Sequence, residues 1–152
     1  WGHRTSHISY KPKVEASSGG PYVMPNVRRA IEDAYARAGI GVGDLDGIET
    51  HDCFSTTEYM AIDHFGVTAP GESWKAVENG DIAFGGRIPV NPSGGLIGLG
   101  HPVGATGVRM MLDAAKQVSG TAGDSRGEGA RRLGVLNCGG GGPAVAGFAV
   151  AA

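Results

Sequence analysis

Residues Asn91 to Gly107 read Asn-Pro-Ser-Gly-Gly-Leu-Ile-Gly-Leu-Gly-His-Pro-Val-Gly-Ala-Thr-Gly, and this stretch decides how the chain is interpreted. It places one imidazole, that of His101, among six glycines and two prolines. A glycine has no Cβ, so a backbone or a ligand can approach it closely, at a cost in conformational entropy on folding. A side chain that titrates near neutral pH in such surroundings indicates a reaction site rather than a packing site.

A helix is predicted to follow this stretch, from Gly104 to Val118, with Val108, Met111, Leu112 and Ala115 as its apolar face. The positive end of a helix dipole disfavours imidazolium at His101. A neutral imidazole there can accept a proton near pH 7, as a general base does. The structural alternative is a histidine that is only hydrogen-bonded in a tight turn. A nucleotide site is not supported, because the glycines match neither the GxxxxGK[ST] nor the Rossmann spacing.

Composition bounds the class of protein. The chain has 152 residues, of which 41% are hydrophobic and 18% charged, with a net charge of −2 and no basic block. We therefore expect about one globular domain and no nucleic-acid partner. The apolar runs are too short to span a bilayer. With only two cysteines, far apart in the sequence, neither a disulfide scaffold nor a CxxC metal site is predicted, and the cytoplasm is the default location. The start at Trp1 without a methionine favours a fragment or a processed piece.

Turn and cap signals divide the chain into an N-terminal lead-in segment, residues 1–24, and one domain, residues 25–152. The first 20 residues are expected to be flexible. Helices are predicted at 25–38, 55–65 and 73–78, and strands at 45–50, 133–137 and 144–150, with residues 80–100 mostly loop. This alternation predicts an α/β fold in which a mixed sheet is layered with helices.

The first predicted strand ends at His51-Asp52-Cys53-Phe54. Strand ends are where α/β proteins place their chemistry, and His51 and Cys53 face the same side of an ideal strand. A His-x-Cys metal pair needs further ligands, and His3, His7 and His64 show no fitting spacing. We expect no metal site, and we expect those three histidines to be ordinary surface or terminal residues.

A second thiol, Cys138, ends another predicted strand and is followed by four glycines. Backbone N–H groups without side chains beside them can form an oxyanion hole. The alternative is a small buried cysteine before a hairpin turn, which is common.

Taken together, the three segments resemble the C-terminal half of a thiolase. NPSGGLIGLGHPVGATG is similar to the thiolase Gly-His-Pro signature, and CGGGGPA to the family's terminal Cys-x-Gly-Gly-Gly pattern. His51-Asp52-Cys53-Phe54 stands where most thiolases have Asn-Glu-Ala-Phe, which marks the sterol-carrier-protein-2 type, the acetyl-CoA acetyltransferase/lipid-transfer branch. The resemblance runs from about Val27 to Ala149.

This resemblance implies a thiolase fold of two similar halves, each with a mixed five-stranded sheet. It also implies an acyltransferase that cleaves 3-oxoacyl-CoA with coenzyme A as co-substrate and no bound cofactor. A cysteine nucleophile attacks the 3-keto carbon, acetyl-CoA or propionyl-CoA leaves, and coenzyme A collects the shortened acyl group. Thiolases usually form oligomers, so a homo-oligomer is expected.

The resemblance also implies a role for each motif residue. His101 activates the nucleophile and helps to bind the thioester oxygen, and His51 matches the Asn that positions an oxyanion-hole water. Cys138 matches the acid/base cysteine, and the Gly140 N–H matches a second oxyanion donor. Cys53 matches the alternative acid/base cysteine of the sterol-carrier-protein-2 type. That branch usually lacks the terminal cysteine, so the choice between the two thiols stays open.

The nucleophilic cysteine of the family belongs to the N-terminal half, and nothing in this chain stands in for it. That half also supplies much of the coenzyme A site. We therefore expect an N-terminal thiolase half or a partner chain, and no activity from this chain alone. Two alternatives remain: a thiolase-fold aldolase or lyase that acts on steroid side-chain acyl-CoA, and a non-catalytic module that binds acyl-CoA or lipid.

Overall fold

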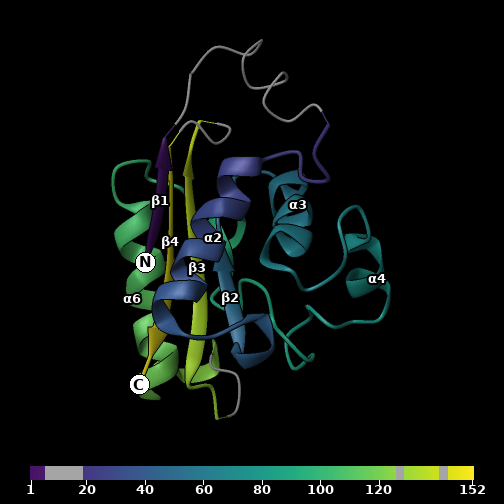
Figure 1. Ribbon diagram of the computed structural model, residues 1–152. Coiled ribbons are helices and arrows are strands. Elements are labelled where there is room, and N and C mark those ends of the chain that lie inside the picture. The colour runs from purple at the N-terminus through teal and green to yellow at the C-terminus, as the bar shows by residue number, and fades with distance from the viewer. Residues whose placement is uncertain (6–18, 126–128, 141–143) are drawn as a thin grey trace.

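The computed structural model describes residues 1–5, 19–125, 129–140 and 144–152. Within these ranges the strands are β1 (Gly2–Thr5), β2 (Gly47–Thr50), β3 (Arg132–Gly139) and β4 (Ala144–Ala151). They form one mixed sheet in the order β1-β4-β3-β2 (Figure 1). β2 and β3 are parallel, whereas β4 is antiparallel to both β3 and β1. The α/β class is confirmed, but the predicted count of five strands is wrong: the described sheet has four.

Helices cover both faces of the sheet. They are α2 (Pro25–Ala38), α3 (Ser55–Phe65), α4 (Ser73–Glu78), α5 (Gly95–Leu99) and α6 (Thr106–Ser119), with 3-10 turns at Val42–Asp44 and Gly123–Ser125. α2 packs against β1 and β4 on one face, and α6 packs against β3 and β4 on the other (Figure 1). α3 and α4 lie beyond β2, next to each other. The domain therefore has three layers, helix, sheet and helix.

Local signals explain where α2 begins and ends. Pro25 occupies the first position, where its missing N–H costs nothing, and Gly39 ends the helix with a left-handed φ of 67°. The helix buries a stripe at helical spacing, namely Val27, Ala30, Ile31 and Ala34, against Ile48, Leu136 and Val145 of the sheet. This helix was predicted from the sequence with the same bounds, and the prediction is confirmed.

The expectation of a flexible N-terminal stretch is wrong for its first residues. Gly2–Thr5 pairs in antiparallel register with Ala144–Gly147 and forms an edge strand. A Cβ on Gly2 would lie 1.9 Å from the carbonyl oxygen of Ala30, so only glycine lets β1 approach α2 this closely. Four residues carry too little periodicity to be recognised as a strand. The prediction for residues 6–18 lies outside the described residues.

The predicted apolar face of α6 is also mostly wrong: of its four residues, only Met111 packs against the core. Val108 and Leu112 are 75% and 51% exposed, whereas Met110 and Ala114 are buried against Leu133 and other sheet residues. Apolar residues occupy two sides of this helix, and spacing alone does not tell which side meets the sheet. α6 therefore presents an apolar stripe outward.

The long loop before α6 contains structure that the sequence did not predict. Gly95–Leu99 forms the short helix α5, and α6 begins at Thr106 rather than Gly104. Within residues 80–100, which were predicted as mostly loop, Val90 forms a parallel bridge with Ile48 of β2. In the described part of the chain, no helix is long and apolar enough to cross a membrane.

Candidate active site

Two parallel strands deliver the first site residues to one end of the sheet. In the register of β2 and β3, Thr50 pairs with Leu136, so the next residues along, His51 and Asn137, stand side by side. The Nδ1 atom of His51 lies 2.7 Å from Oδ1 of Asn137. Because an amide oxygen only accepts, Nδ1 carries the hydrogen and Nε2 is the bare nitrogen of the neutral ring.

His101 reaches the same place from the loop between α5 and α6. Its ring centroid lies 5.0 Å from that of His51, and the two planes meet at 87°. His51 is only 8% exposed, whereas His101 is exposed. Burial lowers the pKa of His51, the hydrogen bond that its Nδ1 donates to Asn137 opposes this, and the nearby His101 adds a further small decrease. His51 is therefore neutral near pH 7.

A buried carboxylate fixes the loop that carries His101. Asp52 accepts the N–H groups of Leu96 and Ile97, at 2.6 and 3.4 Å, and so joins the end of β2 to α5. A Cβ on Gly95 would lie 2.2 Å from an oxygen of this carboxylate, and Gly95 also has a φ of +60°. This junction therefore requires a glycine at position 95.

Asn91 fixes the start of the same loop from a left-handed backbone conformation, with a φ of 51°. Its Oδ1 accepts the Thr50 N–H at 2.7 Å, and its Nδ2 donates to the Glu58 carboxylate at 2.7 Å. The spacing of Ser55 and Glu58 fits a capping box in the sequence. In the structure, however, α3 is capped through Phe54, whose N–H donates to the Thr57 hydroxyl at 3.2 Å.

A third set of contacts surrounds Glu49, which is fully buried in β2. Its carboxylate accepts hydrogen bonds from the N–H and hydroxyl of Ser93 and from Nε2 of Gln117, the last at 2.6 Å. None of these donors is charged, and burial raises the pKa of Glu49 despite their hydrogen bonds. Glu49 thus ties the Asn-Pro-Ser turn and α6 to the sheet.

Both thiols line one cavity of about 700 Å³ together with His51, His101 and Gly140. Cys53 and Cys138 are half-buried and neither is in a disulfide. Burial raises the pKa of Cys138 to about 12, and the neighbouring Cys53 adds to this rise. Cys138 is therefore a thiol, not a thiolate, at neutral pH, which suits a proton donor better than a nucleophile.

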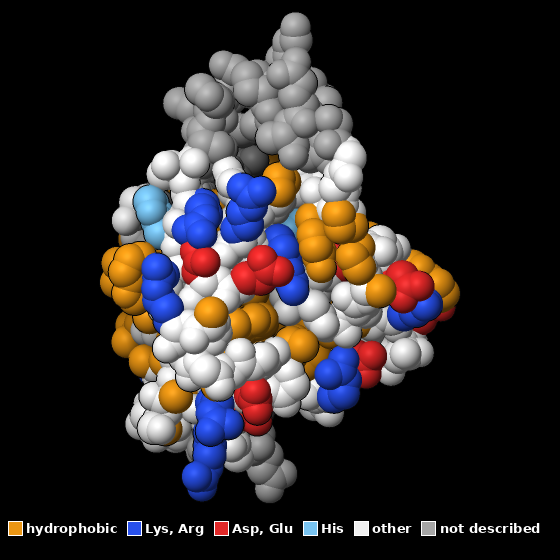
Figure 2. Space-filling view, in the orientation of Figure 1, with side chains coloured by type: hydrophobic (Ala, Val, Ile, Leu, Met, Phe, Trp, Pro, Cys, Tyr) orange, Lys and Arg blue, Asp and Glu red, His pale blue; other side chains and the backbone are white. Residues whose placement is uncertain are grey.

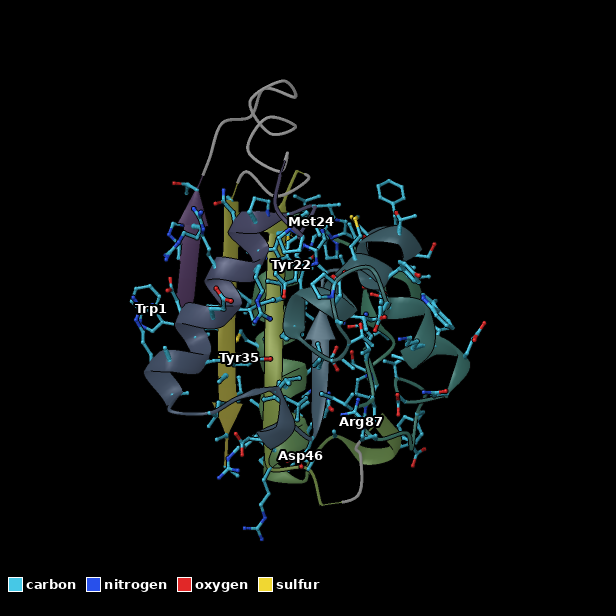
Figure 3. All side chains as sticks on the ribbon, turned by 45° about the vertical axis from the view of Figure 1, so that its right-hand side comes forward. Trp1, Tyr22, Met24, Tyr35, Asp46 and Arg87 are labelled. Atoms are coloured by element: carbon cyan, nitrogen blue, oxygen red, sulfur yellow. The ribbon has the colours of Figure 1, made fainter. Side chains whose placement is uncertain are left out.

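Met24 contributes to the cavity wall from the start of α2. In Figure 3 it lies at the end of the sheet where β2 and β3 finish, and Asp46 lies at the opposite end. The Met24 N–H donates to Nε2 of His64 at 3.1 Å, and Nδ1 of His64 is 2.6 Å from the Met60 carbonyl oxygen. His64 was expected at the surface, but it is fully buried and holds the cavity wall in place. His3 also lines the cavity, and His7 lies outside the described residues.

Comparison with known proteins decides the family. The family model described as thiolase C-terminal domain-like matches residues 11–150. The chain belongs to the thiolase family. Within the described residues of this thiolase domain, no group of three or more His, Cys, Asp or Glu side chains is arranged to hold a metal ion.

Two curated relatives resemble this thiolase domain over much of its length. Sterol carrier protein 2 from Rattus norvegicus is 41% identical over 118 residues, which cover 78% of this chain and 22% of that protein. Acetyl-CoA acetyltransferase from Methanothermobacter thermautotrophicus is 43% identical over 101 residues, which cover 66% of this chain and 26% of the relative. The chain therefore spans about a quarter of the length of these relatives.

A solved structure has the same fold. The Ltp2-ChsH2(DUF35) aldolase matches with a TM-score of 0.79 at 20% sequence identity, and the match covers 99% of this chain and 38% of that one. At this identity the likeness concerns the fold of the thiolase domain alone.

The structure brings together all five site residues that the sequence singled out: His51, Cys53, His101, Cys138 and Gly140 all line the cavity. Their roles stay predictions. Sequence reasoning missed Asn137 and Thr106, each of which holds one of the two imidazoles. The signal for Asn137 was its place at the end of a strand parallel to that of His51. The signal for Thr106 was weaker: it is a hydroxyl side chain five residues after His101, at the start of a helix.

Proposed function

We propose that this thiolase domain supplies the acid/base half of a 3-oxoacyl-CoA thiolase. The observation that supports it most is that two imidazoles, of which the buried His51 is neutral, and a protonated thiol share one cavity: His51, His101 and Cys138. The set offers a base and a proton donor. The nucleophile is a cysteine thiol from the N-terminal half of the protein or from a partner chain.

In the proposed reaction His101 is the base. Its Nε2 takes the proton of the partner's thiol, and the thiolate sulfur forms a bond to the 3-keto carbon of the substrate. The carbon–carbon bond next to it breaks, and its electron pair leaves as the enolate of acetyl-CoA. His51, with a bare Nε2, accepts a hydrogen bond from a water molecule whose other hydrogen faces the developing oxyanion. The Gly140 N–H is the second proposed donor.

Cys138 is the proposed proton donor to the enolate. Transfer of its proton to carbon completes acetyl-CoA and leaves a thiolate in a poorly solvated position, where the raised pKa makes it a strong base. That thiolate takes the proton of the coenzyme A thiol, whose sulfur attacks the acyl-cysteine. The shortened acyl-CoA leaves, and His101 returns its proton to the partner's thiolate. Coenzyme A is thus a co-substrate, and no resident cofactor is needed.

The proposed partner docks over the outward side of α5 and α6. α5, α6 and the loop between them expose large apolar residues: Ile97, Leu99, Val103, Val108 and Leu112. The α2 side differs, because basic and acidic side chains alternate there (Figure 2), among them the pairs Arg4–Asp33 and Arg28–Glu32. Exposed apolar patches of this kind mark interaction sites. The chain covers only about a quarter of the length of these relatives, which supports a further part of the protein outside this chain. Cys53 and Cys138 are both free thiols, which fits the cytoplasm as the proposed location. A homo-oligomer is the proposed assembly.

The test uses the complete assembly, this chain with its N-terminal half, incubated with a 3-oxoacyl-CoA and coenzyme A. We expect acetyl-CoA or propionyl-CoA and a shortened acyl-CoA in equal amounts, and none from this chain alone. An assembly that binds acyl-CoA without shortening it would contradict the proposal and favour a lipid-binding module.

A thiolase-fold aldolase acting on steroid side-chain acyl-CoA is the second candidate, because the solved structure of the same fold is an aldolase. Retro-aldol cleavage needs no thiol relay. Replacing Cys53 and Cys138 together by Ala abolishes thiolysis under the first proposal, whereas cleavage of a 3-hydroxyacyl-CoA that survives the double replacement would favour the aldolase.

A further inference from the structure

Thr106, the first residue of α6, stands directly behind His101. Its side chain is buried, with the residue 1% exposed, although His101 itself is exposed. Oγ1 of Thr106 lies 2.7 Å from Nδ1 of His101 and 3.1 Å from the carbonyl oxygen of Pro102.

The direction of these two hydrogen bonds follows from the number of hydrogens. A hydroxyl has one hydrogen to donate, and a carbonyl oxygen has none. The Thr106 hydroxyl therefore donates to Pro102, and its oxygen accepts a hydrogen from Nδ1 of His101. The reverse assignment would leave two acceptor oxygens facing each other at 3.1 Å. We propose that Thr106 is the positioning residue that holds His101 in the Nδ1–H tautomer, with the lone pair on Nε2 available at the cavity.

The tautomer matters for the reaction, and this consequence rests on the proposed function. A neutral imidazole in water prefers to carry its hydrogen on Nε2, which would leave no lone pair there to take a proton from a thiol. The hydrogen bond to Thr106 reverses this preference before substrate binds. Fixing a tautomer through the second ring nitrogen is how proteins set which nitrogen reacts.

The partner of His101 is neutral, which distinguishes this arrangement from a His–carboxylate pair. The two buried carboxylates that hold the loop before His101, Asp52 and Glu49, accept hydrogen bonds from other groups: Leu96 and Ile97 for Asp52, and Ser93 and Gln117 for Glu49. The titratable side chains that share the cavity with His101 are His3, His51, Cys53 and Cys138. None of these is a carboxylate. Thr106 thus orients the imidazole without adding a negative charge that would favour imidazolium.

Thr106→Val is a sharp variant because it exchanges the hydroxyl for a methyl group of similar shape. The Pro102 carbonyl oxygen keeps two other hydrogen bonds, from the N–H groups of Ala105 at 2.7 Å and of residue 106 at 3.0 Å. The exposed imidazole of His101 can turn to water. Little is left unsatisfied, so the fold should tolerate the change. Thr106→Ser restores the hydroxyl and is the rescue control.

The test is nitrogen NMR of the histidine rings in the chain labelled with 15N-histidine, which reports which ring nitrogen carries the hydrogen and needs no activity. We expect His101 in the Nδ1–H form in the wild type and in Thr106→Ser, and mainly in the Nε2–H form in Thr106→Val. His51, held by Asn137, is an internal reference that should stay in the Nδ1–H form in all three proteins. The wild type alone is decisive if a variant does not fold: His101 in the Nε2–H form would overturn the proposal. An unchanged tautomer in Thr106→Val would overturn it too.

Activity of the complete assembly gives a second, separate readout. Loss of a hydrogen bond worth about 1 kcal/mol predicts that Thr106→Val lowers kcat about fivefold, leaves KM for the acyl-CoA unchanged, and is rescued by Thr106→Ser. If the assembly shows no thiolysis at all, the proposed function fails while the tautomer result stands.

Discussion

Gly107→Ala should disturb the site while leaving the stability of the chain nearly unchanged. Gly107 is the second residue of α6, in ordinary helical conformation, where alanine is favoured over glycine by up to about 1 kcal/mol. However, the new Cβ would lie 2.7 Å from Nδ2 of Asn137. The amide group at the end of that side chain must rotate, because the helix backbone cannot.

Rotation of Asn137 breaks its 2.7 Å hydrogen bond with Nδ1 of His51, at a cost of about 1 kcal/mol. The gain in helix propensity and this loss nearly cancel, so we expect the free energy of unfolding to change by less than about 1 kcal/mol. The imidazole of His51 responds differently. The hydrogen bond to Asn137 is the larger of the two effects that raise the pKa of His51 against burial, the other being the charge of Asp52, so that pKa should fall further.

Urea denaturation measures the stability, and a pH titration of the histidine resonances measures the pKa of His51. Gly104→Ala is the matched control, since a Cβ at Gly104 meets nothing within 4 Å and its φ is not in the left-handed region. It should leave His51 unchanged. The reasoning is refuted if Gly107→Ala leaves the titration of His51 as in the wild type, or if it costs more than about 3 kcal/mol, the upper range for overpacking.

Three further predictions follow from the site and its surface. Glu49→Gln keeps an oxygen acceptor for Gln117 and can donate to the Ser93 hydroxyl. The folded pKa of Glu49 lies above its unfolded value of about 4.5, so the stability that the protonated Glu49 contributes is complete below that pH and is lost as the pH rises through the folded pKa. Denaturation at several pH values should find the variant more stable than the wild type at pH 7 and equal to it at pH 4. Equal stability at pH 7 would argue against a buried carboxylate whose donors are all uncharged. Because its pKa is raised to about 12, Cys138 should react with iodoacetamide at least tenfold more slowly than Cys53 at pH 7.5. Peptide mass spectrometry follows the alkylation of each thiol. Faster alkylation of Cys138 than of Cys53 would rule out its role as a protonated donor. The double variant Val108→Lys, Leu112→Lys on α6 should leave the melting temperature of this chain within a few degrees and abolish binding to the N-terminal half in calorimetry. Val77→Lys on α4, where the side chain is also half exposed, is the control. Unimpaired binding of the double variant would place the partner elsewhere.

Local chemistry made most elements of this fold predictable. Pro25 and Gly39 bound α2, Gly66 ends α3 in a left-handed conformation, and β3 and β4 flank the glycine run that follows Cys138. Each of these signals acts within one turn of the chain, so no knowledge of the packing was needed. The motif residues also meet as expected, because β2 and β3 are parallel and end at the same edge.

What could not be predicted depends on contacts distant in sequence. The inward side of α6 is chosen by the surface of β3 and β4, and its outward stripe is equally apolar in sequence. β1 is defined by its pairing with β4, more than a hundred residues later. Asn137 gains its role only from the register that sets it beside His51. The partners of the two imidazoles therefore needed the structure.

The most direct test of the account is to locate the acyl group during turnover. The complete assembly is mixed with a 3-oxoacyl-CoA in the absence of free coenzyme A, quenched in acid and digested, and the acylated cysteine is identified by mass spectrometry. The account predicts acylation of a cysteine of the N-terminal half and none of Cys53 or Cys138, with the signal lost on His101→Ala. An acyl group on Cys53 or Cys138 would contradict the claim that this domain holds the acid and base but not the nucleophile.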